Sequence, residues 1–197
     1  LPIFGNSDQL WLAALEGCEL IAKSYAFAGA SRGFQRYAAG GFNGRTSPAL
    51  EMISLDRVPM QALDELLRNS AARHSHLCPR QVLGARIGLA GASALGLDVP
   101  RRDKRLLVIL ETDGCFADGV EAATGCAVGH RTLRIEDYGK IAATFVDAPT
   151  GCAVRIAPQP GVRERAALFV PDESRHYFAQ LHAYQFMPDE DLLTVQP

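Results

Sequence analysis

One uninterrupted apolar run, Leu106-Leu107-Val108-Ile109-Leu110, constrains the fold of this 197-residue sequence more than any other feature. The run follows a charged cluster and lacks polar alternation, which predicts a strand buried on both faces. It ends at a turn over residues 111–115, and a short helix is expected near residues 117–124. The sequence therefore predicts a core strand that leads directly into a turn and a helix.

Helical patterns precede this strand, and a hairpin pattern follows it. Apolar residues at helical spacing predict helices near 8–30, 59–72, 79–95 and 172–185. Residues 140–146 and 152–156 flank Pro149-Thr150-Gly151, which is typical of a β-hairpin. This order predicts an α+β fold in which helices pack on a mostly antiparallel, curved sheet. Residues 1–58 are expected to form a helical and irregular extension, and residues 59–197 the core domain with a closing helix.

The helix expected at 79–95 carries Gly84, Gly88 and Gly91 among apolar residues. Each glycine costs a helix about 1 kcal/mol relative to alanine. Three of them in one helix indicate that a sheet or a partner helix packs very close to its backbone.

Composition excludes several classes of protein. Hydrophobic residues make up 48% and charged residues 21%, which is ordinary for a soluble domain with a real core. A formal net charge of −2 without a basic stripe argues against a nucleic-acid surface. No apolar run approaches the roughly 20 residues of a membrane-spanning helix. The expected partners are therefore a small molecule, a metal ion or a protein.

Five cysteines form an odd set without a CxxC pair, which disfavours a disulfide framework and favours a reducing compartment. We therefore expect a cytoplasmic protein. The sequence starts without Met, so either trimming or removal of a leader is compatible with it. Nucleotide-binding glycine motifs and a GxSxG elbow are absent from the sequence, so nucleotide-dependent and serine-hydrolase chemistry lack support.

His74, His76 and Cys78 stand at alternate positions just before Pro79. In an extended chain they share one face and offer two imidazoles and a thiolate to one ion. This donor set suits zinc first, and other late transition metals next. We expect Cys78 and His76 as ligands, with His74 as an acid–base group or a supporting neighbour. The alternative is a solvent-facing histidine and a simply buried Cys78.

Cys115 opens the helix after the buried strand, where backbone N–H groups favour a thiolate. It is expected to join the metal site, and Asp113 could orient an imidazole or a water, or merely cap the helix. Lys140 could attract an anionic substrate or be a solvated charge. Cys126 could be another ligand, although a small residue in a glycine-rich turn is the favoured role.

These motifs resemble the FmdE family, which is named after a subunit of formylmethanofuran dehydrogenase. The resemblance covers roughly residues 60–160 and lies in ordered blocks at 74–79 (HSHLCP), 83–88 (LGARIG), 111–120 (ETDGCFADGV), 124–126 (TGC) and 137–140 (DYGK). It implies a compact, commonly dimeric α+β core with a metal-binding pocket. Ser75 and Arg80 replace glycines usual in that family, and the four-cysteine zinc ribbon often found at its C-terminal end is missing.

The leading hypothesis is a zinc-dependent enzyme that acts on a small polar substrate. His76, Cys78 and Cys115 would bind the ion, and His74 or Asp118 would move a proton. Two alternatives stay open: a non-catalytic, metal-containing subunit or chaperone of an oxidoreductase, and a thiol-redox protein that uses Cys78 and Cys115.

Overall fold

The computed structural model describes residues 60–74 and 76–196, so the expected extension at 1–58 and its helix at 8–30 lie outside the described residues. The elements follow in the order α3 (Met60–His74), α4 (Pro79–Ala94), β1 (Leu106–Leu110), α5 (Cys115–Thr124), the short 3-10 helix η1 (Val128–His130), β2 (Leu133–Ile135), β3 (Ala143–Asp147), β4 (Cys152–Pro158), α6 (Val162–Phe169), α7 (His176–Phe186), α8 (Asp189–Leu192) and β5 (Leu193–Gln196). None of the described helices has the length and hydropathy that a bilayer crossing requires.

The five strands form one sheet in the order β2-β1-β3-β4-β5. β1 is antiparallel to β3, β3 to β4 and β4 to β5, while β2 is parallel to β1. The expected hairpin is formed by β3 and β4, with Phe145 opposite Val154. The α+β class and the mostly antiparallel sheet are thus confirmed. The three-residue β2 was not predicted, because so short a strand carries no clear periodicity.

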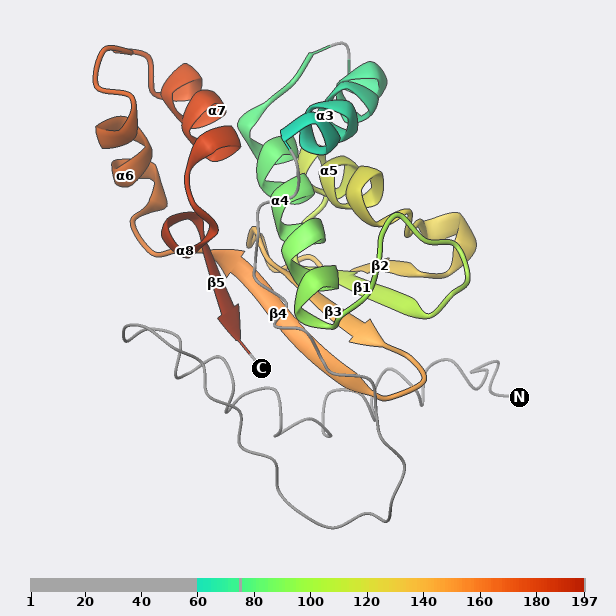
Figure 1. The fold of residues 1–197 in the computed structure, drawn as a ribbon. Helices are drawn as coiled ribbons and strands as arrows, with labels where there is room; N and C mark the ends of the chain where they lie inside the picture. The colour runs from blue at the N-terminus through green and yellow to red at the C-terminus, as the bar shows by residue number, and fades with distance from the viewer. Residues whose placement is uncertain (1–59, 75, 197) are drawn as a thin grey trace.

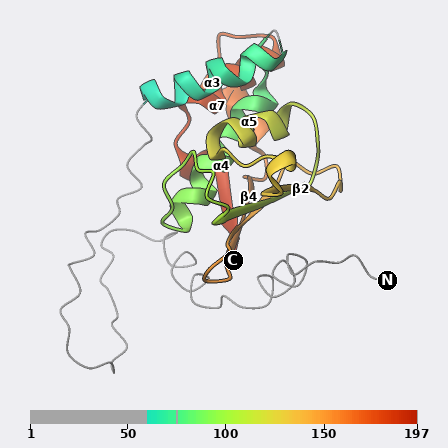
Figure 2. The same cartoon turned by 90° about the vertical axis from the view of Figure 1, so that its right-hand side faces the viewer.

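α3, α4 and α5 lie on one side of the sheet, as two perpendicular views show (Figure 1, Figure 2). α4 packs against β3 and β4 at its C-terminal half. A Cβ atom at Gly91 would lie 2.2 Å from the ring of Phe145, so the aromatic ring occupies the space that a side chain would need. The close approach expected from the glycines of this helix is therefore confirmed for the sheet.

The same glycines bring α4 against α5. A Cβ atom at Gly84 would lie 2.2 Å from the Phe116 carbonyl oxygen, and one at Gly88 would lie 2.9 Å from the Cβ of Ala123. Contacts advance along both helices in the same direction, so α4 and α5 run parallel. Their first turns consequently lie at the same end of the molecule, and this places the loop before α4 beside the turn before α5.

α7 begins at His176, four residues later than expected. The C-terminal end of α7 is held against α4. The largely buried guanidinium of Arg86 donates hydrogen bonds to the carbonyl oxygens of Tyr184 and Met187 and pairs with Asp189. A cation suits this end of a helix, because its last carbonyl groups lack helical partners. Arg86 therefore fixes where α7 lies relative to α4.

Asp147, at the end of β3, gives the fold a testable pH dependence. Its buried carboxylate accepts hydrogen bonds from Arg105 Nε (2.7 Å) and from Thr150 Oγ1 (2.9 Å). The Arg105 hydrogen bond is the main cause that lowers the pKa of Asp147. A lowered pKa stabilises the fold above the usual carboxyl value of about 4. This stabilisation is lost as the pH falls through the folded-state pKa.

We expect Asp147→Asn to reduce the free energy of unfolding by roughly 1–3 kcal/mol at pH 7. The difference from wild type should shrink as urea unfolding is repeated between pH 6 and pH 3. Asp172→Asn, at an exposed turn, is the control. A difference that stays constant down to pH 3 would show that the Asp147 charge does not stabilise the fold.

Candidate functional site

The loop between α3 and α4 is anchored by one buried side chain. Gln81 is fully buried, and its amide oxygen accepts a hydrogen bond of 2.8 Å from the backbone N–H of Cys78. Its amide nitrogen donates to the carbonyl oxygen and to Oγ of Ser70 in α3, both at 3.2 Å. Pro79 starts α4, as its missing N–H allows. Gln81 therefore holds the backbone of Cys78 between two helices.

Cys78 and Cys115 lie at the starts of α4 and α5, at the same end of the molecule. Cys115 is the first residue of α5 and follows Gly114, whose φ of +73° is a turn conformation that glycine adopts without strain. The Cys78 thiol lies close enough to Cys115 to raise the pKa of Cys115. The two cysteines come from the starts of two parallel helices, so the α4–α5 packing brings them near each other.

The environment of Cys115 differs from the expected thiolate-favouring helix end. Burial raises the pKa of Cys115, and the hydrogen bond to Cys78 and the repulsion by that neighbouring group raise it further. A backbone hydrogen bond lowers the pKa of Cys115, but it is the weaker influence. The helix-end argument was incomplete because it did not include a second thiol beside the first.

Tyr177, near the start of α7, completes the surroundings of the thiols. Its hydroxyl donates a hydrogen bond of 3.2 Å to the Leu77 carbonyl oxygen, directly before Cys78. Burial raises the pKa of Tyr177, and repulsion from Cys78 and Cys115 raises it further. Cys78 is 7% exposed and Tyr177 43%. The thiol pair thus lies just below a surface that α7 borders.

The histidines of the motif are placed less completely. His76 is exposed on the loop, two residues before Cys78. His74 ends α3, and its side chain lies outside the described residues. Among the side chains that the structure describes, no three of His, Cys, Asp and Glu are close enough together to hold an ion. The described residues therefore supply a pair of thiols and a nearby exposed imidazole.

The other candidates divide between the site and the rest of the fold. Asp118 lies one turn after Cys115 and acts on it electrostatically, and Asp113 is exposed in the preceding turn. Lys140 is exposed. The pKa of Glu111, at which the expected turn begins, is lowered mainly by the hydrogen bond from Arg155 and only slightly by the charge of Lys140.

Cys126 lies apart from the thiol pair. It is buried beyond the far end of α5, where its thiol donates a hydrogen bond of 3.4 Å to the Leu106 carbonyl. The structure therefore places it among core residues of the fold.

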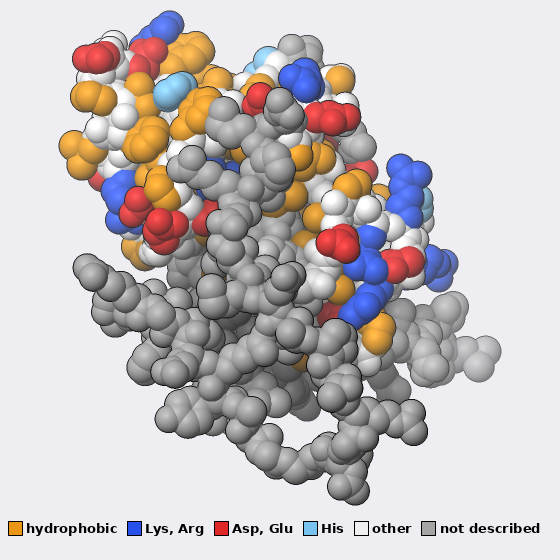
Figure 3. Space-filling model, in the orientation of Figure 1, with side chains coloured by type: hydrophobic (Ala, Val, Ile, Leu, Met, Phe, Trp, Pro, Cys, Tyr) orange, Lys and Arg blue, Asp and Glu red, His pale blue; other side chains and the backbone are white. Residues whose placement is uncertain are grey.

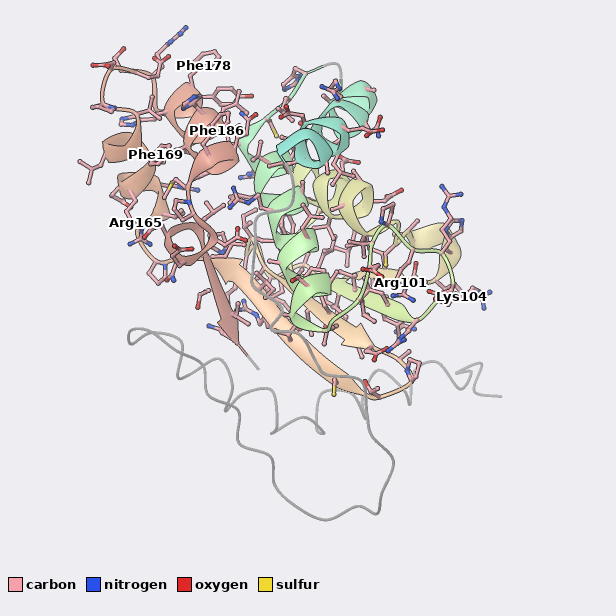
Figure 4. The ribbon with its side chains drawn as sticks, in the orientation of Figure 1. Arg101, Lys104, Arg165, Phe169, Phe178 and Phe186 are labelled. Carbon is pink, nitrogen blue, oxygen red and sulfur yellow. The ribbon has the colours of Figure 1, made fainter. Side chains whose placement is uncertain are left out.

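Hydrophobic side chains gather on the surface of α6 and α7 (Figure 3). The exposed ones are Leu168, Phe169, Tyr177 and Phe178, of which Leu168 is 79% exposed. Phe178 lies near the start of α7, whereas Phe186 lies near its other end (Figure 4). At Tyr177, this apolar surface borders the loop before Cys78.

Sequence reasoning missed Gln81 and Tyr177. Gln81 had a usable signal, because a glutamine three residues after a helix cap often bonds back to the cap backbone. Tyr177 is one hundred residues from Leu77 in the chain and offered no such local signal.

One protein family matches most of the described chain. The family described as "FmdE, Molybdenum formylmethanofuran dehydrogenase operon" matches residues 73–194. A probable S-adenosyl-L-methionine-binding protein of Archaeoglobus fulgidus is 34% identical over 101 residues, which are 50% of this chain and 28% of that protein. The chain therefore spans less than a third of that relative.

A solved structure shares the fold. It is a tungsten formylmethanofuran dehydrogenase FmdE-like protein from Syntrophus aciditrophicus, with a TM-score of 0.50 and 22% identity. The likeness covers 68% of this chain and 70% of that one.

Proposed function

This chain belongs to the FmdE family, and from that premise we propose that it binds a zinc ion through Cys78, Cys115 and His76. The observation that carries the proposal is the parallel packing of α4 and α5, which brings Cys78 and Cys115 to the same end of the molecule, where Cys78 raises the pKa of Cys115. Two sulfur ligands with imidazole nitrogen form a donor set that zinc prefers, although another late transition metal could also use it.

Thiolate and imidazole groups suit a zinc ion, but zinc binding also requires a movement of His76. Cys78 and Cys115 lie at the starts of two neighbouring helices, and His76 is in the same loop as Cys78. Because His76 is exposed, its imidazole must turn toward the sulfurs when the ion binds. Gln81 keeps the backbone of Cys78 in place while the more exposed part of the loop adjusts.

A site with three protein ligands leaves one position open, as in catalytic rather than structural zinc sites. The ion would polarise a small polar substrate at that position. Asp118, one turn after Cys115, is suited to accept or return a proton, and His74 is the alternative for this role. The proposal is therefore a metal-dependent enzyme acting at the surface between α4, α5 and α7.

The proposal also includes a cellular location and a protein partner. A cytoplasmic location would keep both thiols reduced. The exposed apolar residues of α6 and α7 favour a protein partner, either a second copy of the chain or an oxidoreductase that this protein would serve as an accessory component. Binding of S-adenosyl-L-methionine is not proposed, because the chain spans only 28% of the relative named for it.

Thiol redox chemistry is the second candidate, and the proximity of Cys78 to Cys115 favours it. A peroxide would accept two electrons from Cys78 and Cys115, which would lose two protons and form a disulfide, while the peroxide would be reduced to water or an alcohol.

Elemental analysis of tag-free protein, with thiol titration before and after chelation, tests the proposal. We expect about one zinc ion per chain, and two thiols that become reactive when the ion is removed. Metal-free protein that takes up no zinc on dialysis would contradict metal binding. If mild peroxide then joined Cys78 to Cys115 in a peptide map, thiol redox chemistry would replace it.

A further inference from the structure

Tyr177 reaches the candidate site from a part of the chain that none of the sequence motifs includes. α7 is anchored to α4 at its C-terminal end by Arg86, whose guanidinium bonds to the carbonyl groups there. Near its other end, the Tyr177 hydroxyl donates to the Leu77 carbonyl. α7 is therefore attached to the α3–α4 unit at both ends, once at the helix and once at the loop before Cys78.

The backbone of that loop has two different supports. Gln81 holds the N–H of Cys78 from inside the core, whereas Tyr177 holds the preceding carbonyl group from the surface. These bonds engage adjacent residues from opposite directions. Together they restrict rotation of the backbone that sets where the Cys78 side chain points.

We propose that Tyr177 is a positioning residue that holds the Leu77–Cys78 backbone and thereby keeps the Cys78 thiol against Cys115. The effect of Tyr177 on metal affinity rests on the proposed function, because it requires that Cys78 bind a metal ion. The held conformation itself does not depend on an ion. Groups that orient metal ligands in this way commonly contribute 10–100-fold to metal affinity.

The neighbours of Tyr177 keep its ring in place independently of the hydroxyl. The Phe178 ring packs edge-on against it with ring centroids 5.2 Å apart, and the Arg175 guanidinium lies 4.1 Å above the Phe178 ring. Phenylalanine at position 177 retains these ring contacts and removes only the hydrogen bond. Tyr177→Phe is therefore the informative variant, and Tyr138→Phe, at an exposed tyrosine bonded to Glu136, is its matched control.

The first measurement is the alkylation rate of each cysteine in metal-free, full-length protein, followed by peptide mass spectrometry. We expect Tyr177→Phe to raise the rate at Cys78 about five- to tenfold and to leave the rate at buried Cys126 unchanged. General loosening of the fold would raise both rates, so Cys126 is an internal control. Tyr138→Phe should change neither rate.

The second measurement is titration with Co²⁺, whose absorption reports thiolate ligands. We expect Tyr177→Phe to weaken Co²⁺ binding about tenfold and to alter the visible band, as loss of a ligand-orienting group does. If the wild-type protein binds no Co²⁺ and no zinc, the proposed function fails, and the alkylation rates still test the positioning role. A Tyr177→Phe protein in which Cys78 reacts at the wild-type rate would overturn the inference, whatever its metal affinity. Should Tyr177→Phe fail to fold, Tyr177→Leu measured in the same way replaces it.

Discussion

Purified Cys78→Ser protein is expected to contain almost no zinc, whereas the wild type should contain about one ion per chain. Serine keeps the size of the side chain but offers a hydroxyl group in place of a soft thiolate. The backbone N–H of residue 78 remains free to donate to Gln81, so the loop and the start of α4 should stay folded. The measurement is elemental analysis after gel filtration, with circular dichroism to confirm the fold.

Cys152→Ser is the matched control for this loss. Cys152 is also a free cysteine, partly exposed, but it starts β4 at the hairpin, away from the first turns of α4 and α5. We expect it to retain the wild-type amount of zinc. Stoichiometric zinc in Cys78→Ser would show that Cys78 is not a ligand and would remove the central element of the proposed site.

Alanine at Gly84 should cause the largest loss of stability among single methyl additions to α4. The added Cβ would lie 2.2 Å from the Phe116 carbonyl oxygen and 3.0 Å from the Val120 nitrogen, and both are backbone atoms of a helix. Such atoms cannot yield as a flexible side chain does, so α4 and α5 must move apart. We expect the free energy of unfolding to fall by about 3 kcal/mol, despite the better helix propensity of alanine.

Gly84→Ala should also affect the proposed zinc site. Moving α4 away from α5 separates Cys78 from Cys115, so zinc affinity should fall as well. Urea unfolding and zinc competition with a chromophoric chelator measure the two effects. Gly129→Ala is the control, because no atom of the described residues lies within 4 Å of a Cβ there. A Gly84→Ala protein as stable as Gly129→Ala would contradict the packing described for α4 and α5.

Local patterns in the sequence were sufficient for most of the elements. The apolar run at 106–110 became β1, and the residues around Pro149-Thr150-Gly151 became the β3–β4 hairpin. The strand was predictable from a continuous apolar run, and the hairpin from turn residues between two nearby strands. The glycines of α4 also indicated a close contact, although they could not say whether its partner was the sheet or α5. They contact both.

The sequence by itself determined the α+β class, the family motifs and the identity of the two thiols, because each of these resides in the order of residues along the chain. Only the tertiary structure decided that α4 and α5 run parallel, so that Cys78 and Cys115 lie near each other where the two helices start. It also decided that Tyr177 lies beside them. Contacts between residues far apart in the chain follow from how helices pack on one another, and periodicity within a single segment carries no information about that packing.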